Sequence, residues 1–214
     1  MSKVIVSRFG ALCALGALFA VVAAIAPLGT AALGQQTPTV RIRGTIDAVD
    51  GSLLSIKTRE GSDVKVKMTD NVSVFAVVKT ELSQIKEGSY IGVSAMPEPD
   101  GTQKAFAVHI FPENQRGAAE GFRPWDLRAN STMTNATVAE TVKGTDGQNI
   151  LVKYKDGEKK VVVPPETPIV TFVASDKSEV KAGSHIIIFA ANKNGDMLEA
   201  NRVNVGRDGV TPPM

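Results

Sequence analysis

Residues 45–57 read TIDAVDGSLLSIK, and residues 141–153 read TVKGTDGQNILVK. Each stretch places an Asp-Gly pair between runs of alternating apolar and polar residues, which is the pattern of a β-hairpin. The two Asp-Gly pairs lie 96 positions apart, and a second match, SQIKEG at 83–88 with SEVKAG at 178–183, lies 95 positions apart. A nearly constant offset indicates an internal duplication. Two long copies predict two small domains, whereas a solenoid needs three or more shorter repeats.

Each copy reads as a series of short strands. In the first copy, three extended runs are followed by a polar stretch, 80–88, that indicates one or two helical turns ended by glycine, and then by two more strands. The second copy has the same order, with its helical turn at 176–182. This order predicts an all-β protein of tandem OB-like five-stranded barrels, each with a short helix between strands three and four. A two-sheet sandwich is the alternative, although closing the sheet hides its edges and favours a barrel.

The first 34 residues differ from the rest. Lys3 and Arg8 precede an uncharged, largely apolar run over 9–34, and the run ends in Ala-Leu-Gly at 32–34. A positive start, an apolar run and small residues at its end are the pattern of a secretory signal peptide, so we expect cleavage near Gln35. An uncleaved membrane anchor is the alternative, since about 20 apolar residues span a bilayer.

The predicted organisation has five parts: signal peptide 1–34, first OB-like barrel 35–111, aromatic-bearing linker 112–136, second OB-like barrel 137–207 and flexible tail 208–214. The predicted location is periplasmic or secreted, with no membrane span after cleavage. The whole chain has 24 basic and 22 acidic residues, and the signal carries two of the basic ones, so the mature chain is neutral. Its charge would not draw in nucleic acid. The single cysteine, Cys13, leaves with the signal, which excludes a Cys nucleophile or thiolate metal site from the mature chain.

The linker is richer in aromatic residues than a flexible connector. It holds Phe122, Arg123 and Trp125, and Trp125 is the single tryptophan of the chain. In one interpretation, Phe122 and Trp125 pack on a barrel and hold the domains together. In another, their aromatic faces and Arg123 form a binding platform. Disorder is the third possibility. Because burying an aromatic side chain is worth roughly 1.5–3 kcal/mol, we predict that Trp125 is largely buried.

A second candidate binding surface follows from the barrel prediction. OB barrels commonly bind ligands on the outer face of strands two and three, and strand alternation turns outward the basic side chains of Lys57, Arg59, Lys65 and Lys67. The alternative is that these are solvated lysines that discourage edge pairing. Exposed aromatic residues for stacking bases are missing from this face, so nucleic acid is not an expected partner.

The sequence offers little catalytic chemistry. His109 and His185 occupy non-equivalent places in the two copies and show no metal-ligand spacing. Neither a Gly-x-Ser-x-Gly elbow nor a phosphate-binding Gly-Lys-Ser/Thr loop occurs. We therefore expect no catalytic residues, no metal site and no cofactor.

Five segments carry a resemblance to a known family. They are GTIDAVDG at 44–51, VHIFPE at 108–113, RPWDL at 123–127, STMTNA at 131–136 and RVNVGRDG at 202–209. On these segments the chain resembles a family of small exported bacterial proteins with duplicated OB-like domains of unknown function. The resemblance implies the barrel fold and brings no established activity. Members are sometimes labelled metal-transporter permeases, but a permease needs several long apolar spans, which the mature sequence lacks.

The functional expectation is an exported, non-enzymatic binding or envelope-accessory protein, whose partner is an envelope component or another protein. Two alternatives stay open: a periplasmic metal-handling accessory protein, and a hydrolase with a site between the two barrels.

Overall fold

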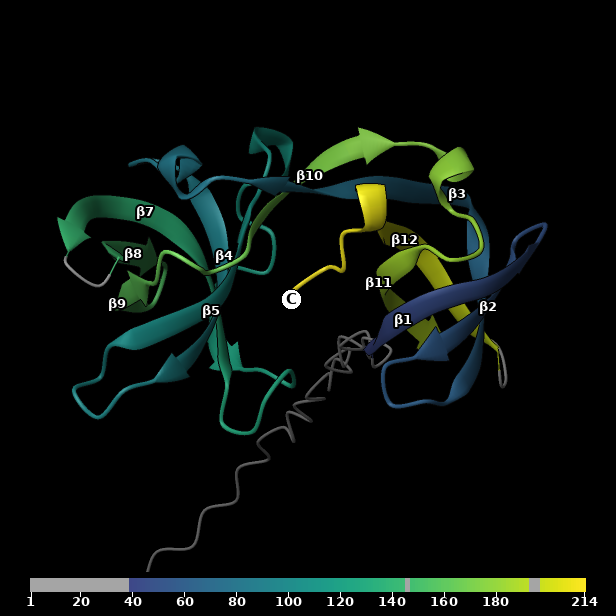
Figure 1. The fold of residues 1–214 in the computed structure, drawn as a ribbon, viewed down its shortest axis with the longest axis horizontal. Helices are drawn as coiled ribbons and strands as arrows, with labels where there is room; N and C mark the ends of the chain where they lie inside the picture. The colour runs from purple at the N-terminus through teal and green to yellow at the C-terminus, as the bar shows by residue number, and fades with distance from the viewer. Residues whose placement is uncertain (1–38, 145–146, 193–196) are drawn as a thin grey trace, which may run out of the picture. The chain divides into compact units, whose positions relative to one another are not determined.

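The computed structural model describes residues 39–144, 147–192 and 197–214, and within these ranges the chain is built of β-strands. Figure 1 traces these strands in chain order. The prediction of an all-β protein containing a closed five-stranded barrel is confirmed. The predicted signal peptide, its cleavage site and the apolar run lie outside the described residues.

Two five-stranded rings close among the described strands. The first barrel joins, in order round the ring, β1 (Thr39–Asp50), β2 (Leu53–Thr58), β3 (Asp63–Thr80), β12 (Leu198–Gly206) and β11 (His185–Asn192). The second barrel joins β7 (Thr132–Gly144), β8 (Gly147–Tyr154), β9 (Gly157–Val163), β5 (Gln103–Ile110) and β4 (Tyr90–Pro97). In both rings one neighbouring pair, β3 with β12 or β9 with β5, is parallel and the others are antiparallel.

The two halves of the chain exchange strands. The first barrel takes β1, β2 and β3 from the first half, but its closing strands β11 and β12 come from the second half. The second barrel is closed in the same way by β4 and β5 of the first half. The prediction that residues 35–111 and 137–207 each form a barrel is therefore wrong in its boundaries, because each barrel needs both segments.

Two long strand segments carry the chain between the barrels. Strand β3 has 18 residues, about 60 Å at ~3.3 Å per residue, which is longer than one small barrel. Its second half pairs antiparallel with β10 (Ile169–Ser175), where Val77 lies opposite Phe172. The corresponding segment in the second half of the chain is divided into β9 and β10. Pro164 and Pro165 interrupt it, because proline has no backbone N–H to donate to a neighbouring strand. Neither segment folds back onto the barrel it leaves. Strand β3 leads to β4 and β5 of the second barrel, and β10 leads to β11 and β12 of the first.

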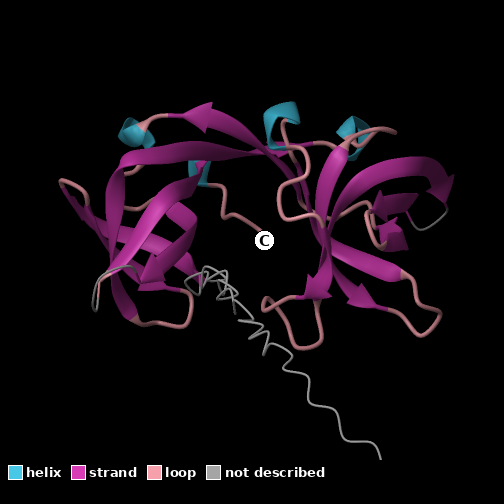
Figure 2. Cartoon of the chain, turned by 180° about the vertical axis from the view of Figure 1, so that it is seen from behind, coloured by secondary structure: helices cyan, strands magenta, loops and turns pink. Residues whose placement is uncertain are grey.

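The helical segments are short. The helices predicted at 80–88 and 176–182 are single 3-10 turns, η1 (Leu82–Gln84) and η3 (Lys177–Glu179), and two more such turns are η2 (Glu113–Gln115) and η4 (Arg207–Gly209). Figure 2 separates these turns from the strands. No α-helix lies in the described ranges, and no helix found there has the length and apolar character needed to cross a membrane.

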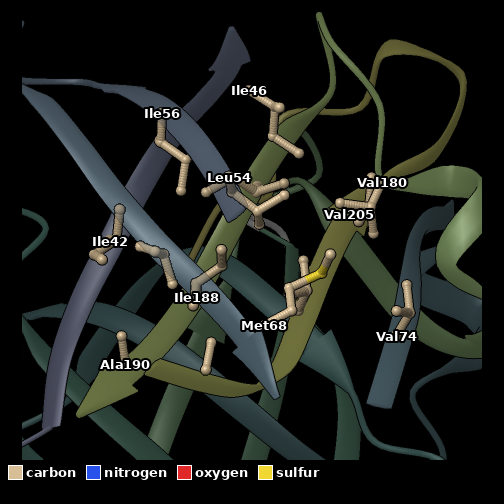
Figure 3. Packing of buried hydrophobic residues seen from close by; sticks show 14 residues of the cluster. Ile42, Ile46, Leu54, Ile56, Met68, Val74, Val180, Ile188, Ala190 and Val205 are labelled. Atoms are coloured by element: carbon tan, nitrogen blue, oxygen red, sulfur yellow. The ribbon is translucent and has the colours of Figure 1, made fainter. Parts of the chain in front are cut away.

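Each barrel encloses its own apolar core. Figure 3 shows the core of the first barrel, where Leu54 and Ile56 of β2 meet Ile188 of β11 and Val205 of β12. All four side chains are almost completely buried. At about 25 cal/mol per Å² of apolar surface, burial of such side chains is the main force that favours closing a ring. Because the β2 residues and their partners belong to different halves, this force also holds the halves together.

The linker and the tail are both packed. The predicted linker 112–136 contains β6 (Gly121–Pro124), which pairs with β7, and its last residues already belong to β7. The predicted flexible tail, residues 208–214, instead lies against the barrels, with Val210 and Met214 buried. Arg59 donates to the carbonyl oxygen of Pro212 at 2.7 Å, and Arg43 donates to a main-chain oxygen of Met214 at 2.9 Å. The prediction of a free tail is corrected by these contacts.

Candidate functional site

A third apolar cluster lies between the two barrel cores. It joins Val77 of β3, Phe172 of β10 and Ile187 of β11 to Met133 of β7 and to Trp125. Trp125 is 8% exposed, so the prediction that it is largely buried is confirmed. Its ring also stacks under Arg41, whose guanidinium carbon lies 4.3 Å from the ring centre. The linker thus connects elements of both barrels.

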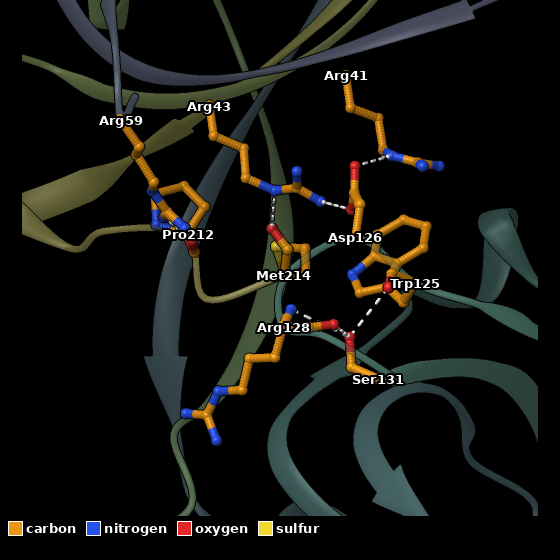
Figure 4. A network of polar contacts seen from close by, with 9 residues as sticks. All are labelled: Arg41, Arg43, Arg59, Trp125, Asp126, Arg128, Ser131, Pro212 and Met214. Carbon is orange, nitrogen blue, oxygen red and sulfur yellow. Dashed lines mark hydrogen bonds and ion pairs between the residues drawn. The ribbon is translucent and has the colours of Figure 1, made fainter. Parts of the chain in front are cut away.

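A polar network surrounds this tryptophan (Figure 4). Asp126 accepts hydrogen bonds from Nε of Arg41 at 2.8 Å and from a terminal nitrogen of Arg43 at 2.7 Å. Burial raises the pKa of the Asp126 carboxyl, but the hydrogen bonds from Arg43 and Arg41 outweigh it and lower the pKa to about 2. Ser131 closes the linker turn by donating to the carbonyl oxygen of Trp125. The network fixes the linker against β1.

A pocket of about 350 Å³ opens beside Trp125, between elements of the two barrels. We call it the central pocket, and its lining is Arg41, His109, Phe111, Ala118, Ala119, Arg123, Trp125, Met133, Asn135, Phe172, Ile187, Phe189, Arg202, Asn204 and Met214. The lining combines aromatic and sulfur-containing side chains with three guanidinium groups. Its volume falls within the range of small-molecule sites in proteins.

His109 is 5% exposed and lies in an aromatic cluster within this lining. Its ring meets Phe111 edge-on at 4.6 Å and Phe172 edge-on at 5.5 Å, measured between ring centres. The ring fits because residue 92 is glycine: a Cβ atom there would lie 2.1 Å from the imidazole. Burial, and then the nearby charges of Arg123 and Arg202, lower the pKa of His109 to about 3. His109 is therefore neutral at physiological pH.

Two arginines of the pocket are held in place by neutral groups. Arg202 donates to the side-chain oxygens of Asn204 and Gln115, both at 2.9 Å. Its guanidinium carbon also lies 4.2 Å from the ring centre of Phe75. Arg123 donates to the carbonyl oxygen of Ala119 at 2.9 Å. Burial lowers the pKa of both guanidinium groups, although both stay protonated.

The predicted site residues fall into two groups. Arg123 and Trp125 line the central pocket. Phe122 does not: it is 39% exposed, and the Lys159 ammonium lies 4.5 Å from its ring centre. The four predicted basic residues of the first barrel lie elsewhere: Lys57, Lys65 and Lys67 are exposed on the strands, Lys57 pairs with Asp63 at 2.9 Å, and Arg59 holds the tail.

Sequence reasoning missed Arg202 and Asn135 as pocket residues. Arg202 belongs to the resembling segment 202–209, but no local pattern marks it, because the strand exchange alone brings it beside the linker. His109 and His185 do not belong to one cluster of metal-ligating side chains. His185 Nδ1 lies 3.0 Å from the hydroxyl of Thr45, and the described residues contain no group of three or more His, Cys, Asp or Glu placed to hold a metal.

A larger hollow, about 880 Å³, lies on the second barrel beside β8 and β9. Its charged lining residues are four acidic and two basic side chains: Glu98, Asp100, Glu140, Glu166, Lys104 and Lys160. It lacks aromatic side chains and enclosing walls from a second barrel. We therefore take the central pocket as the candidate site.

Comparison with known proteins adds no functional information: no family model, no curated protein and no solved structure matches the chain.

The buried histidine predicts an acid-dependent loss of stability. The unfolded chain takes up a proton at the ordinary histidine pKa of about 6.5, whereas folded His109 does so near 3. Between these values protonation favours the unfolded state, so lowering the pH from 7 to 4.5 should remove about 2.5 kcal/mol through this group. Urea unfolding at both pH values should show His109→Asn losing correspondingly less than the wild type. His185→Asn is the matched control and should keep the full loss; an unchanged loss in His109→Asn would contradict the assignment.

Proposed function

We propose that the chain is an exported, non-enzymatic binding protein whose ligand is a small molecule held in the central pocket. The observation that carries this proposal is a pocket of ligand size whose walls combine aromatic side chains with three guanidinium groups. Within the described residues, Asn135 Oδ1 and Trp125 Nε1 are buried and accept or donate no hydrogen bond. A buried polar group without a partner costs about 1–3 kcal/mol, and both atoms belong to residues of the lining.

The fold supports a pocket that exists before the ligand arrives. In each ring the last strand of one half's three-stranded run, β3 or β9, lies parallel to the second strand supplied by the other half, β12 or β5. This arrangement supports describing the pair as duplicated OB-like barrels with exchanged closing strands. The pocket walls come from both barrels, and β3 and β10 bind the barrels to each other. A preformed site spends little binding energy on ordering its own walls.

The lining favours binding over hydrolysis. Neither Ser, Cys, Asp nor Glu lines the pocket among the described residues, so a nucleophile with an adjacent base is not assembled there. His109, with its pKa lowered to about 3, is a weak base. General base catalysis works best with a pKa near the working pH.

Fluorescence provides the test, because Trp125 is the single tryptophan and lines the pocket. The probe is N-phenyl-1-naphthylamine, an uncharged aromatic compound whose emission rises in apolar surroundings. We expect saturable binding with energy transfer from Trp125. Ala118→Leu adds bulk to the lining and should weaken probe binding at least tenfold, about 1.4 kcal/mol.

The matched control is Ala174→Leu, which makes the same change at an exposed position of β10 outside the lining. This variant should bind the probe like the wild type. If the probe does not saturate, or both variants bind equally, the proposed pocket function is wrong.

A further inference from the structure

We infer that the central pocket binds the negatively charged end of its ligand at Arg123 and Arg202. The ligand class is then a small organic anion, a carboxylate or sulfonate with an apolar body. This inference rests on the proposed function, and it adds the charge and the orientation of the ligand.

Two arginines of the pocket lack an acidic partner among the described residues. The ion pairs among the described residues employ other arginines: Arg41 and Arg43 share Asp126, Arg116 pairs with Glu113, and Arg207 pairs with Glu179. Within the described part of the chain, neither Arg123 nor Arg202 lies within ion-pair distance of an acidic side chain. Both are half-buried, and burying a charge without a partner is costly. An anion in the pocket would offset that cost.

Two acidic residues, Glu120 and Asp126, are adjacent in sequence to lining residues, and both already have other partners: Glu120 accepts from the backbone N–H of Lys155 at 3.0 Å, and Asp126 from two arginines. The two carboxylate oxygens of Asp126 already accept from Arg41 and Arg43, which makes one carboxylate shared by two guanidinium groups. It therefore cannot also neutralise Arg123 and Arg202. Neutral His109 adds no negative charge to the lining either. Among the described residues, the lining carries three guanidinium side chains and no acidic side chain.

The guanidinium group of Arg202 is already oriented without a ligand. The guanidinium lies over the rings of Phe75 and Phe172, at 4.2 and 5.3 Å from their centres, and two amide oxygens hold it by hydrogen bonds. Those bonds use two of the five N–H donors of a guanidinium. The group is thus fixed in position with donors left over, which lowers the entropic cost of binding a carboxylate or sulfonate.

Arg123 complements it from the linker. One terminal nitrogen donates to Ala119, and the guanidinium carbon lies 5.7 Å from the ring centre of Trp125. The charges of Arg123 and Arg202 both act on His109, which places the two guanidinium groups around the same buried ring. The apolar part of the ligand would then lie against the aromatic walls, Trp125, Phe111 and Phe172.

The test compares two probes that share one aromatic skeleton and differ in charge. 8-Anilinonaphthalene-1-sulfonate carries a sulfonate that N-phenyl-1-naphthylamine lacks. We expect the wild type to bind the sulfonate at least tenfold more tightly than the uncharged probe. Arg202→Met and Arg123→Met should each remove most of this preference, which is measured as the ratio of the two affinities within each variant. Lys67→Met, which removes an exposed charge of β3 outside the lining, should leave both affinities unchanged.

The outcomes separate the two proposals. If neither probe binds, the pocket function itself fails. If both bind the wild type equally, or Lys67→Met lowers sulfonate binding as much as the pocket variants do, the pocket stands and the anion assignment is overturned. A competition measurement on the wild type needs no variant: octanoate should displace the uncharged probe at a concentration at least tenfold below that of octanol, and equal displacement would again overturn the assignment.

Discussion

Separated halves of the chain, residues 36–116 and 117–214, are expected to show no cooperative unfolding transition as monomers and to regain the native fold when mixed in equal amounts. The reason is the strand exchange: the first fragment holds β1, β2 and β3 without β11 and β12, which close their ring. The second fragment likewise lacks β4 and β5. Each monomeric fragment would expose an open sheet and the apolar face of its strands, and burying that face is what stabilises a domain of this size.

Circular dichroism during heating provides the measurement, with analytical ultracentrifugation to establish the mass of each species. The control is the full chain cut at the same bond after folding, which should stay associated and keep its transition. Self-association of one fragment into a folded dimer would agree with the exchange, since a second copy supplies equivalent strands. A single fragment that folds as a stable monomer would show that strands of one half close a ring unaided.

Replacing Trp125 by alanine is expected to lower the free energy of unfolding by about 3–5 kcal/mol, the usual cost of truncating a large buried aromatic side chain. The side chain fills the cluster between the barrels, and its loss would leave a cavity beside Met133, Phe172 and Ile187. The stacking of Arg41 on the ring would be lost as well. Since a domain is commonly stable by only 5–15 kcal/mol, this is a large fraction of the total.

Urea unfolding followed by far-ultraviolet circular dichroism measures this change without relying on tryptophan emission. Trp125→Phe is the control, because it keeps an aromatic ring and most of the apolar volume; it should cost less than half as much. A loss below about 1 kcal/mol in Trp125→Ala would mean that the cluster does not depend on the linker.

The secondary structure followed from local patterns in the sequence, whereas the pairing of strands did not. Alternation and Asp-Gly turns predicted the β1–β2 and β7–β8 hairpins, and both are present. The choice of partner for β4 or β11 depends on apolar faces that look alike: β4 presents Ile91 and Val93 inward, and β11 presents Ile186 and Ile188. Either pair of strands suits either ring by composition, so the apolar pattern of these strands carried no signal for the exchange.

The alignment of the two copies was also partly misleading. The two Asp-Gly pairs are 96 positions apart, but the matching bulges in the strands before them fall after Ile46 and after Val138, which are 92 positions apart. The second hairpin is therefore four residues longer, and the turn motif hid this difference. The length of β3 was the available clue to the exchange, because no Gly or Pro interrupts residues 63–80.

The candidate site could be predicted only where one segment supplied its residues. Arg123 and Trp125 stand two positions apart in the linker, so an aromatic and basic cluster was visible there. Arg202, Asn135 and His109 come from β12, β7 and β5, and only the pairing of distant strands gathers them. The lysines of β2 and β3 were correctly predicted to be exposed, because strand alternation decides which side chains point outward. They do not belong to the central pocket, however.

The exchanged strands give the molecule an approximate two-fold axis through the contact of Val77 with Phe172, and the central pocket is bordered by positions that this axis relates. Arg41 corresponds to Met133, and His109 corresponds to Asn204, as their strand partners show. In a homodimer, a pocket on such an axis has the same residue on both sides, and an asymmetric ligand faces two equivalent orientations. Joining both halves in one chain removes that restriction. Each side of the pocket is free to diverge, so one wall carries a buried imidazole over Gly92 while the other carries an amide beside Ile187.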